Sequence, residues 1–257
     1  MLRRFRERRE QRLIDKDLSS LIGRDETALL NYLREKNANR QSFGKIFCIG
    51  YNKTGTTSLE AVLKGLGFRM PDQAFQERLA SHVLVSGKYD VLRGLVEHYD
   101  AFQDLPFSQE NAYVALDAMF PDSKFILTIR DPDSWFESLL EFHKNVFGFD
   151  NVDDLSPDYW HGAKYLHNNY VFEQHRRHVT KVNNGHVFEN WADLYDRDFM
   201  ISSFISRNNE IIRYFRDRPS DFLCLDVSQE TDTSKVCSFL HVDKDNITEF
   251  PRLNARY

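Results

Sequence analysis

Short apolar runs alternate with amphipathic stretches along most of the chain. Four runs are too short for buried helices and are rich in strand-forming residues, and they lie at 45–50, within 99–107, at 124–130 and at 221–227. Each is followed by helical spacing of apolar residues, as in TSLEAVLKGLGF, where Leu59, Val62, Leu63 and Leu66 share one face. This alternation predicts an α/β fold, a three-layer sandwich with a mostly parallel central sheet.

Helical patterns also dominate two further regions, residues 1–43 and 150–217. In the first, RDETALLNYLREK places Leu29, Leu30 and Leu33 on one face, which predicts a helical N-terminal extension. The second is aromatic and polar, without low complexity or an obvious linker. We therefore expect a single domain over 1–257.

Composition narrows the class of protein. A formal net charge of −5 over 257 residues argues against a mainly electrostatic nucleic-acid binder, so no nucleic-acid partner is expected. No apolar run reaches the roughly 18–20 residues of a membrane span, and the N-terminus lacks the apolar core of a secretory signal. Cys48, Cys224 and Cys237 are expected to be buried free thiols, which suits a reducing compartment. We expect a soluble, cytoplasmic protein.

The stretch IGYNKTGTTSL forms the first strand–loop–helix junction. Gly50 and Gly55 have the separation of a nucleotide-triphosphate loop, but Thr56 stands where that loop requires lysine. An ordinary ATPase or GTPase is therefore disfavoured. Backbone N–H groups at the helix start and nearby hydroxyl groups still favour an anion with phosphate or sulfate oxygens. The alternative is a glycine turn with a threonine-capped helix.

A second junction follows the clearest strand, KFILTIR. Arg130 ends this strand, Asp131 is a plausible helix N-cap, and Pro132 stands at the first helical position. In a parallel sheet, ligands bind outside the carboxyl ends of the strands. The two junctions are thus candidates for one site.

These two motifs together resemble those of the sulfotransferases that use 3'-phosphoadenosine 5'-phosphosulfate (PAPS). YNKTGTTSL is similar to their 5'-phosphosulfate loop, and RDPDSWFES supplies an arginine and a serine eight residues later, Arg130 and Ser138. The pattern is closest to a microbial branch with GxxKTGTTSL and KFILTxRDPxxW, and it covers residues 45–140 well. The late strand FLCLDV and its helix match only thinly.

The resemblance implies roles for particular residues. Arg130 and Ser138 would bind the 3'-phosphate, and Lys53 would also stabilise the bridging oxygen as the sulfuryl group leaves. The residues implied for the 5'-phosphate and sulfate are Lys53, Thr54, Gly55, Thr56, Thr57 and Ser58. The acceptor side is expected within 150–217.

The catalytic base is the main departure from the family pattern. Where cytosolic sulfotransferases have a histidine–leucine–proline segment, this chain has Asp104, Leu105 and Pro106. Asp104 is accordingly the candidate base, with a raised pKa favouring that role. Alternatively Asp104 caps a helix or pairs with Lys53 or Arg130. His98 is a second candidate for the base.

Three weaker sets of candidates remain. His175 and His178 could share a helical face, but no carboxylate or cysteine spacing completes a metal site, so none is expected. Arg252 and Arg256 could contact the 3'-phosphate or simply face solvent. Aromatic residues that could line an acceptor pocket, or be core, are Trp135, Tyr165, Tyr170, Trp191 and Tyr195.

The sequence therefore predicts a sulfotransferase. It would move a sulfuryl group from PAPS to a hydroxyl or amine on a small-molecule or glycan acceptor, releasing adenosine 3',5'-bisphosphate (PAP). Two alternatives stay open. One is an ATP-dependent, kinase-like phosphotransferase that uses magnesium, and the other is a nucleotide-binding protein without catalysis.

Overall fold

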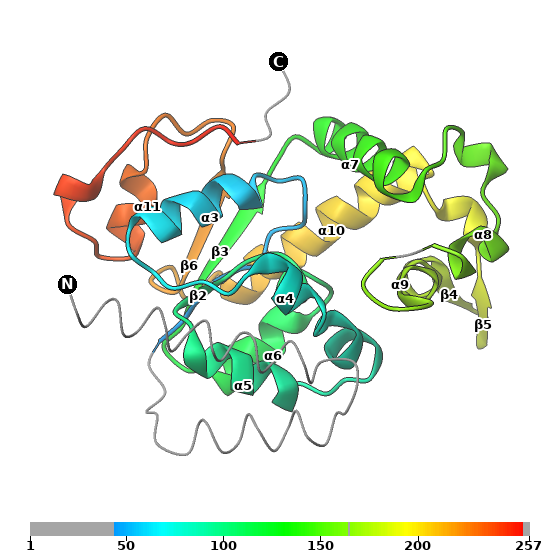
Figure 1. Ribbon diagram of the computed structural model, residues 1–257, viewed down its shortest axis with the longest axis horizontal. Coiled ribbons are helices and arrows are strands. Elements are labelled where there is room, and N and C mark those ends of the chain that lie inside the picture. The colour runs from blue at the N-terminus through cyan, green and yellow to red at the C-terminus, as the bar shows by residue number, and fades with distance from the viewer. Residues whose placement is uncertain (1–43, 164, 254–257) are drawn as a thin grey trace.

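A computed structural model describes residues 44–163 and 165–253. Its centre is a parallel four-stranded sheet (Figure 1). The strand order is β2 (Ala101–Phe102), β1 (Ile46–Cys48), β3 (Lys124–Ile129), β6 (Phe222–Asp226). All four predicted strands are confirmed, and the parallel pairing brings the two predicted junctions to neighbouring strand ends, because β1 pairs directly with β3.

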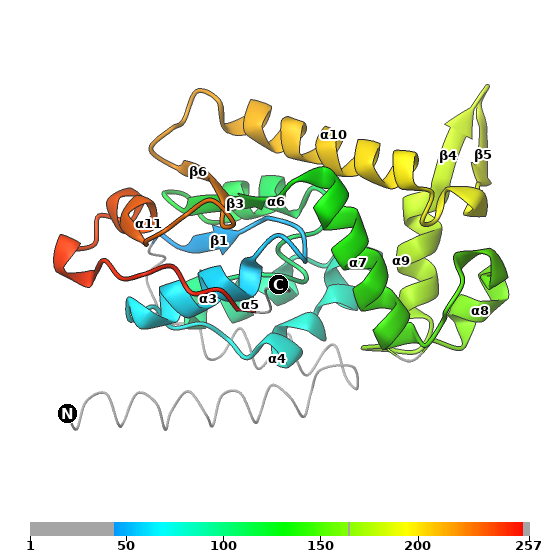
Figure 2. The same cartoon turned by 90° about the horizontal axis from the view of Figure 1, so that it is seen from above.

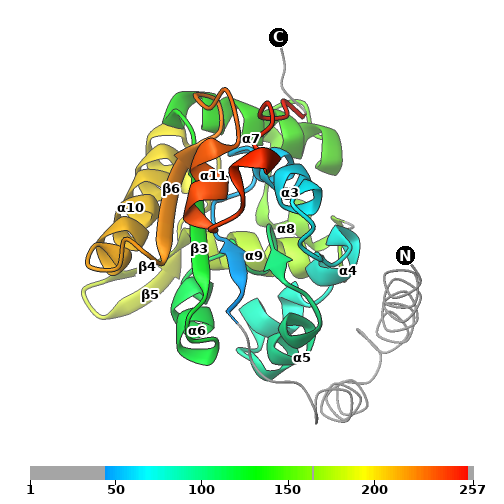
Figure 3. The same ribbon diagram turned by 90° about the vertical axis from the view of Figure 1, so that its left-hand side faces the viewer.

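Alternating side chains of the strands enter two different hydrophobic clusters. Phe47 and Phe125 pack with α5 (Asp90–His98), α6 (Ala112–Met119) and α10 (Arg197–Phe215). Cys48 and Ile126 pack instead with α3 (Thr56–Gly65) and α11 (Ser234–Phe239). Helices therefore cover both faces, as the period-two pattern of strand side chains requires. Figures 2 and 3 show α10 and α3 on opposite sides of the sheet, which confirms the three-layer sandwich.

The helix after β3 begins as its sequence predicts. In α7 (Pro132–Phe147), the Asp131 carboxylate accepts a hydrogen bond from the Ser134 backbone N–H at 2.9 Å. Pro132 occupies the first turn, and Gly148 ends the helix with a left-handed φ of 78°. Trp135 stacks on Phe204 of α10, with 4.2 Å between ring centroids. Both ends of α7 are thus fixed by local sequence, and its packing joins it to α10.

The described residues of 150–217 form helices and one hairpin, α8 (Pro157–His161), α9 (Tyr170–Val179), β4 (Thr180–Asn183), β5 (His186–Glu189) and α10. The elements that precede α10 lie at one end of the molecule, and α10 runs from there back along the sheet (Figures 1 and 2). The antiparallel hairpin was missing from the helix-dominated expectation. Its turn, Asn184–Gly185, has positive φ angles of 49° and 78°, and an Asn-Gly pair is a recognisable hairpin signal.

The three cysteines differ in their burial. Cys48 and Cys237 are buried, but Cys224 is exposed, so the expectation of three buried thiols is wrong. Cys224 lies on β6, an edge strand of the sheet. The helical extension predicted for 1–43 lies outside the described residues. The remaining short helices are α4 (Gln73–Glu77), η1 (Ser81–Val85), η2 (Val152–Asp154), η3 (Trp191–Asp193) and η4 (Lys244–Asn246).

Candidate active site

The loop between β1 and α3 packs tightly against Thr128 of β3 and against Val227, the residue that follows β6. A Cβ atom added to Gly50 would lie 2.0 Å from the Thr128 hydroxyl oxygen and 2.5 Å from the Thr128 carbonyl oxygen. At Gly55, φ is 96° and an added Cβ would lie 2.9 Å from Val227. Both glycines are required by close backbone approach, and Gly55 also by its left-handed conformation. The loop is therefore held tightly at the carboxyl ends of the strands.

The loop hydroxyls fall into two groups. Thr54 is buried, and its hydroxyl bonds to the Tyr51 carbonyl and, at 2.6 Å, to the Thr128 hydroxyl. Ser58 is also buried and accepts a hydrogen bond from the Leu253 backbone N–H at 3.1 Å. Thr57, in the first turn of α3, is only partly buried. The Thr54 hydroxyl is thus engaged with protein groups, whereas Thr57 is a less buried residue of the same loop.

The second junction contacts the first directly. Arg130 Nη1 donates a hydrogen bond to the Lys53 carbonyl at 3.1 Å. The Trp135 indole N–H likewise donates to the Asn52 carbonyl at 3.2 Å. Ser138 is partly buried further along α7. The structure therefore brings the cationic residues of the two sequence motifs into one place.

Asp104 follows β2 and precedes the cis peptide bond between Leu105 and Pro106. One carboxylate oxygen accepts the Leu105 backbone N–H at 2.8 Å, and the other accepts the Gln73 side-chain amide at 3.1 Å. Lys53 and Asp104 both hold left-handed backbone, with φ of 68° and 60°. Such conformations cost free energy in residues other than glycine and cluster at functional sites.

A second carboxylate lies close to Asp104. Glu77 on α4 accepts a hydrogen bond from the same Gln73 amide at 2.7 Å and from the Tyr165 hydroxyl at 3.3 Å. Burial, together with the negative charges of Glu77 and Glu60, raises the pKa of Asp104 from 3.8 to about 6, and Lys53 opposes the rise. Asp104 thus titrates near the pH at which a general base is effective. No motif in the sequence pointed to Gln73 or Glu77.

Arg207 of α10 was also missed by the sequence analysis. Its guanidinium donates to the Ile49 carbonyl at 3.0 Å and to the Ser108 carbonyl at 2.7 Å. The same group lies 4.2 Å from the centroid of the Tyr51 ring, and its burial lowers the Arg207 pKa below its usual value. Arg207 therefore ties the end of β1 to the turn after Asp104.

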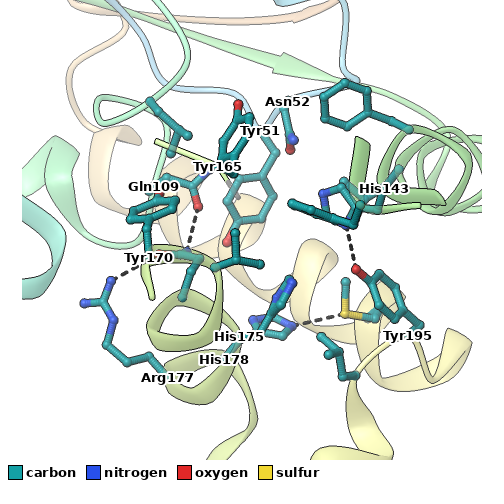
Figure 4. Close-up of a pocket in the computed structure, with 18 of the residues that line it drawn as sticks. Tyr51, Asn52, Gln109, His143, Tyr165, Tyr170, His175, Arg177, His178 and Tyr195 are labelled. Atoms are coloured by element: carbon teal, nitrogen blue, oxygen red, sulfur yellow. Dashed lines mark hydrogen bonds between the residues drawn. The ribbon is translucent and has the colours of Figure 1, made fainter. Parts of the chain in front are cut away.

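A cavity of about 460 Å³ opens beside the loop (Figure 4). Trp135, Tyr165, Tyr170 and Tyr195 line it, whereas Trp191 does not and instead stacks on Phe172 at 5.5 Å. The other lining residues are Tyr51, Asn52, Leu105, Gln109, Glu110, Leu139, Phe142, His143, Phe147, Val171, Gln174, His175, Arg177, His178, Leu194 and Met200. Most of them come from α7, α9 and the segment that precedes α10.

The weaker candidates occupy other positions. His98 is buried at the end of α5 and does not line the cavity. His178 Nε2 contacts the Met200 sulfur at 3.1 Å. Within 44–163 and 165–253, no group of three His, Cys, Asp or Glu side chains could hold a metal ion. Arg252 donates to the carbonyls of Val227 and Glu230, both at 2.7 Å, so it anchors the C-terminal tail. Arg256 lies outside the described residues.

None of the helices in the described ranges has both the length and the apolar character needed to cross a membrane.

One of the comparisons with known proteins identifies the family of the chain. A search of curated proteins found no match. The family model described as "Sulfotransferase domain" matches residues 45–257, which include both strand–loop–helix junctions, the Asp104 turn and the cavity. The chain therefore belongs to the sulfotransferase domain family.

Proposed function

We propose that this sulfotransferase takes its sulfuryl group from PAPS, transfers it to a hydroxyl or amine and releases PAP. The observation that carries the proposal is the contact between Arg130 and the Lys53 carbonyl. It holds a guanidinium beside the anion-binding loop, as a nucleotide with phosphates on both its 5' and 3' sides requires.

The donor would lie across the two junctions. The loop from Lys53 through Thr54, Gly55, Thr56 and Thr57 to Ser58 would bind the 5'-phosphate and sulfate, mainly through backbone N–H groups at the start of α3. Arg130 and Ser138 would bind the 3'-phosphate. Because Gly50 and Gly55 lack side chains, the loop can pack directly against Thr128 and Val227, which holds its backbone N–H groups in place at the strand ends.

The reaction would proceed by in-line displacement at sulfur. The acceptor oxygen or nitrogen forms a bond to sulfur, while the bond from sulfur to the bridging oxygen breaks and leaves its electron pair on the 5'-phosphate of PAP. Lys53 stabilises that developing charge. Asp104 takes the acceptor's proton, and its raised pKa makes the carboxylate a stronger base than an ordinary aspartate.

Two adjacent features support this assignment of roles. Lys53 Nζ lies 4.6 Å from the centroid of the Phe142 ring, which lines the cavity. Leu105, next to Asp104 in the chain, lines the same cavity. Lys53 and Asp104 do not themselves line the cavity, but each adjoins a residue that does, so an acceptor bound there would lie near both catalytic candidates.

Transfer of ³⁵S from labelled PAPS to acceptors in a cell extract tests the proposal. The wild-type chain should label an acceptor, and Lys53→Ala and Asp104→Asn should each lose transfer while still binding PAP. The change in melting temperature on adding PAP or magnesium-ATP distinguishes this proposal from the two alternative functions. Stabilisation by magnesium-ATP but not by PAP would favour a kinase-like enzyme, and PAP binding without any transfer would favour a non-catalytic protein.

A further inference from the structure

The charged side chains that line the cavity, among the described residues, compensate each other. In 44–163 and 165–253, Glu110 and Arg177 are the only acidic and basic lining side chains apart from histidines, and they pair with each other, with 2.9 Å between Arg177 Nη2 and Glu110 Oε1. Arg177 also donates to the Gln174 amide oxygen at 3.2 Å. A charged acceptor would therefore find no free counter-charge among these groups.

Burial disfavours the charged form of the three histidines that line the cavity, because it lowers the pKa of each. Burial and the nearby Lys53 lower the pKa of His143 to about 4, and its Nδ1 lies 2.9 Å from the Tyr195 hydroxyl oxygen. Burial also lowers the pKa of His178, and lowers that of His175 well below its usual value. The histidines thus favour the uncharged form, in which each can hydrogen-bond on an otherwise aromatic and aliphatic wall.

Within the described part of the chain, His175 brings an unpartnered polar atom to the wall of the cavity. It is 8% exposed, its ring lies 4.4 Å from that of Trp160, and it rises from α9 toward the space between the lining residues (Figure 4). Its Nε2 has no hydrogen-bond partner among the described residues. A buried polar group of this kind is normally satisfied, and a hydroxyl of a bound molecule would satisfy it.

Different residues line the two ends of the cavity. Tyr51, Asn52 and Leu105 line the end that adjoins the loop and Asp104, whereas His175 lies on α9. A volume of about 460 Å³ is within the usual range for a small-molecule site. Flat aromatic walls such as Trp135 and Tyr165 favour a planar ring system between these two ends.

We propose that the acceptor is an uncharged, planar ring compound with polar groups at both ends, one hydroxyl reacting near Asp104 and the other bonding to His175. This inference rests on the proposed function and specifies the acceptor class of that site. It favours aromatic alcohols over sulfated or carboxylated glycans and over charged peptides.

Transfer of ³⁵S from labelled PAPS by the full chain tests this acceptor class. The four acceptors compared are 2-naphthol, 2,6-dihydroxynaphthalene, 6-hydroxy-2-naphthoate and N-acetylglucosamine. After correction for its two equivalent hydroxyls, the diol should exceed 2-naphthol by about fivefold in kcat/KM, from one added hydrogen bond. The naphthoate should be at least about tenfold poorer than 2-naphthol, because its carboxylate is buried without a counter-charge. The sugar should be the poorest.

The variant His175→Phe tests the proposed hydrogen bond between the second hydroxyl of the acceptor and His175. This variant keeps an aromatic ring against Trp160 but removes the nitrogen, so the diol preference should fall to about one. His186→Phe, at an exposed position of β5, is the matched control and should keep the preference. PAP-induced thermal stabilisation verifies that each variant is folded.

Three results would overturn the inference. They are better transfer to the naphthoate or the sugar than to the naphthols, no transfer to any of the four, and an unchanged diol preference in His175→Phe. PAP binding separates the two proposals. If PAP binds and an extract acceptor is labelled, the proposed function stands even when the acceptor class is wrong, whereas failure to bind PAP contradicts the proposed function itself.

Discussion

Arg130 Nη1 lies 3.1 Å from the carbonyl oxygen of Lys53 and donates a hydrogen bond to it. The two residues belong to different motifs, one after β3 and the other after β1, and the pairing of those strands brings the motifs together. The contact places one cation at the edge of the loop that carries another. The two motifs recognised separately in the sequence therefore lie against each other in the structure.

The pH dependence of transfer should follow the ionisation of Asp104. Its pKa is about 6, so kcat/KM should rise with pH up to about 6 and level off above 7, because only the ionised carboxylate accepts a proton. Asp104→Asn should lower kcat by roughly 10²–10⁴-fold and remove the rising limb. Steady-state rates between pH 5 and 8 provide the measurement.

Asp122→Asn is a matched control for that experiment. Asp122 is exposed and has a φ of 62°, close to the 60° of Asp104, so both substitutions have the same backbone preference. Asp122→Asn should keep the full pH profile. An Asp104→Asn variant that retained the rising limb would show that another group is the base.

Asp104 should also weaken the fold near neutral pH. Its folded-state pKa is raised from 3.8 to about 6, so between these values the folded chain binds more protons than the unfolded chain. The free energy of unfolding therefore falls as pH rises through this window, by at most about 3 kcal/mol. Relative to wild type, Asp104→Asn should unfold at a higher temperature at pH 7, and the difference should shrink at pH 4.

Thermal unfolding of both variants at the two pH values measures this effect. Asp122→Asn supplies the baseline for replacing an aspartate in left-handed backbone. An Asp104→Asn difference that is the same at pH 4 and pH 7 would show that burial does not raise the pKa of Asp104.

Arg207→Lys should destabilise the protein although it preserves the charge. Lysine cannot bond both the Ile49 and Ser108 carbonyls in the guanidinium's geometry or stack in the same way on Tyr51. We expect a loss of about 2–4 kcal/mol, or a fall in Tm of roughly 5–15 °C. Differential scanning calorimetry would measure the change in Tm.

Arg213→Lys, at an exposed position of the same helix, is the matched control and should change Tm by less than about 2 °C. Equal effects of the two substitutions on Tm would contradict the role assigned to Arg207.

Two glycine substitutions on the same junction should act in opposite directions. Gly50→Ala forces a methyl group against Thr128 and should cost about 3 kcal/mol or more, lowering both Tm and PAP binding. Gly65→Ala, in the last turn of α3, meets nothing within 4 Å and should raise Tm by about 1–3 °C. Thermal unfolding with and without PAP compares them. A Gly50→Ala protein as stable as wild type would refute the close packing of the loop.

The sequence predicted those structural elements that are specified by a few consecutive residues. Short apolar runs identified the strands, Asp131 and Pro132 predicted the start of α7, and the spacing of Gly50 and Gly55 identified the loop. In these cases the signal lies within a few consecutive residues, so no tertiary information is needed.

The sequence did not predict groups that become functional through packing. Glu77 and Gln73 lie on a short helix without a motif, and only the fold brings them to Asp104. Arg207 resembles any other arginine of a long helix until its burial beneath the loop is seen. Conversely, the Asn184–Gly185 turn was a local signal, and the hairpin was missed because its exposed strands lack a buried apolar face.

The most direct test of the account compares PAP with 5'-AMP, which lacks the 3'-phosphate, as ligands of the wild type and of Arg130→Ala. Calorimetric titration should show that the wild type prefers PAP, and that Arg130→Ala loses about 10- to 100-fold in PAP affinity with little change for 5'-AMP. Arg216→Ala, an exposed arginine substitution, should behave as wild type. Equal affinity of the wild type for the two nucleotides, or an equal loss for both in Arg130→Ala, would contradict the claim that Arg130 and the Lys53 loop bind opposite ends of one donor.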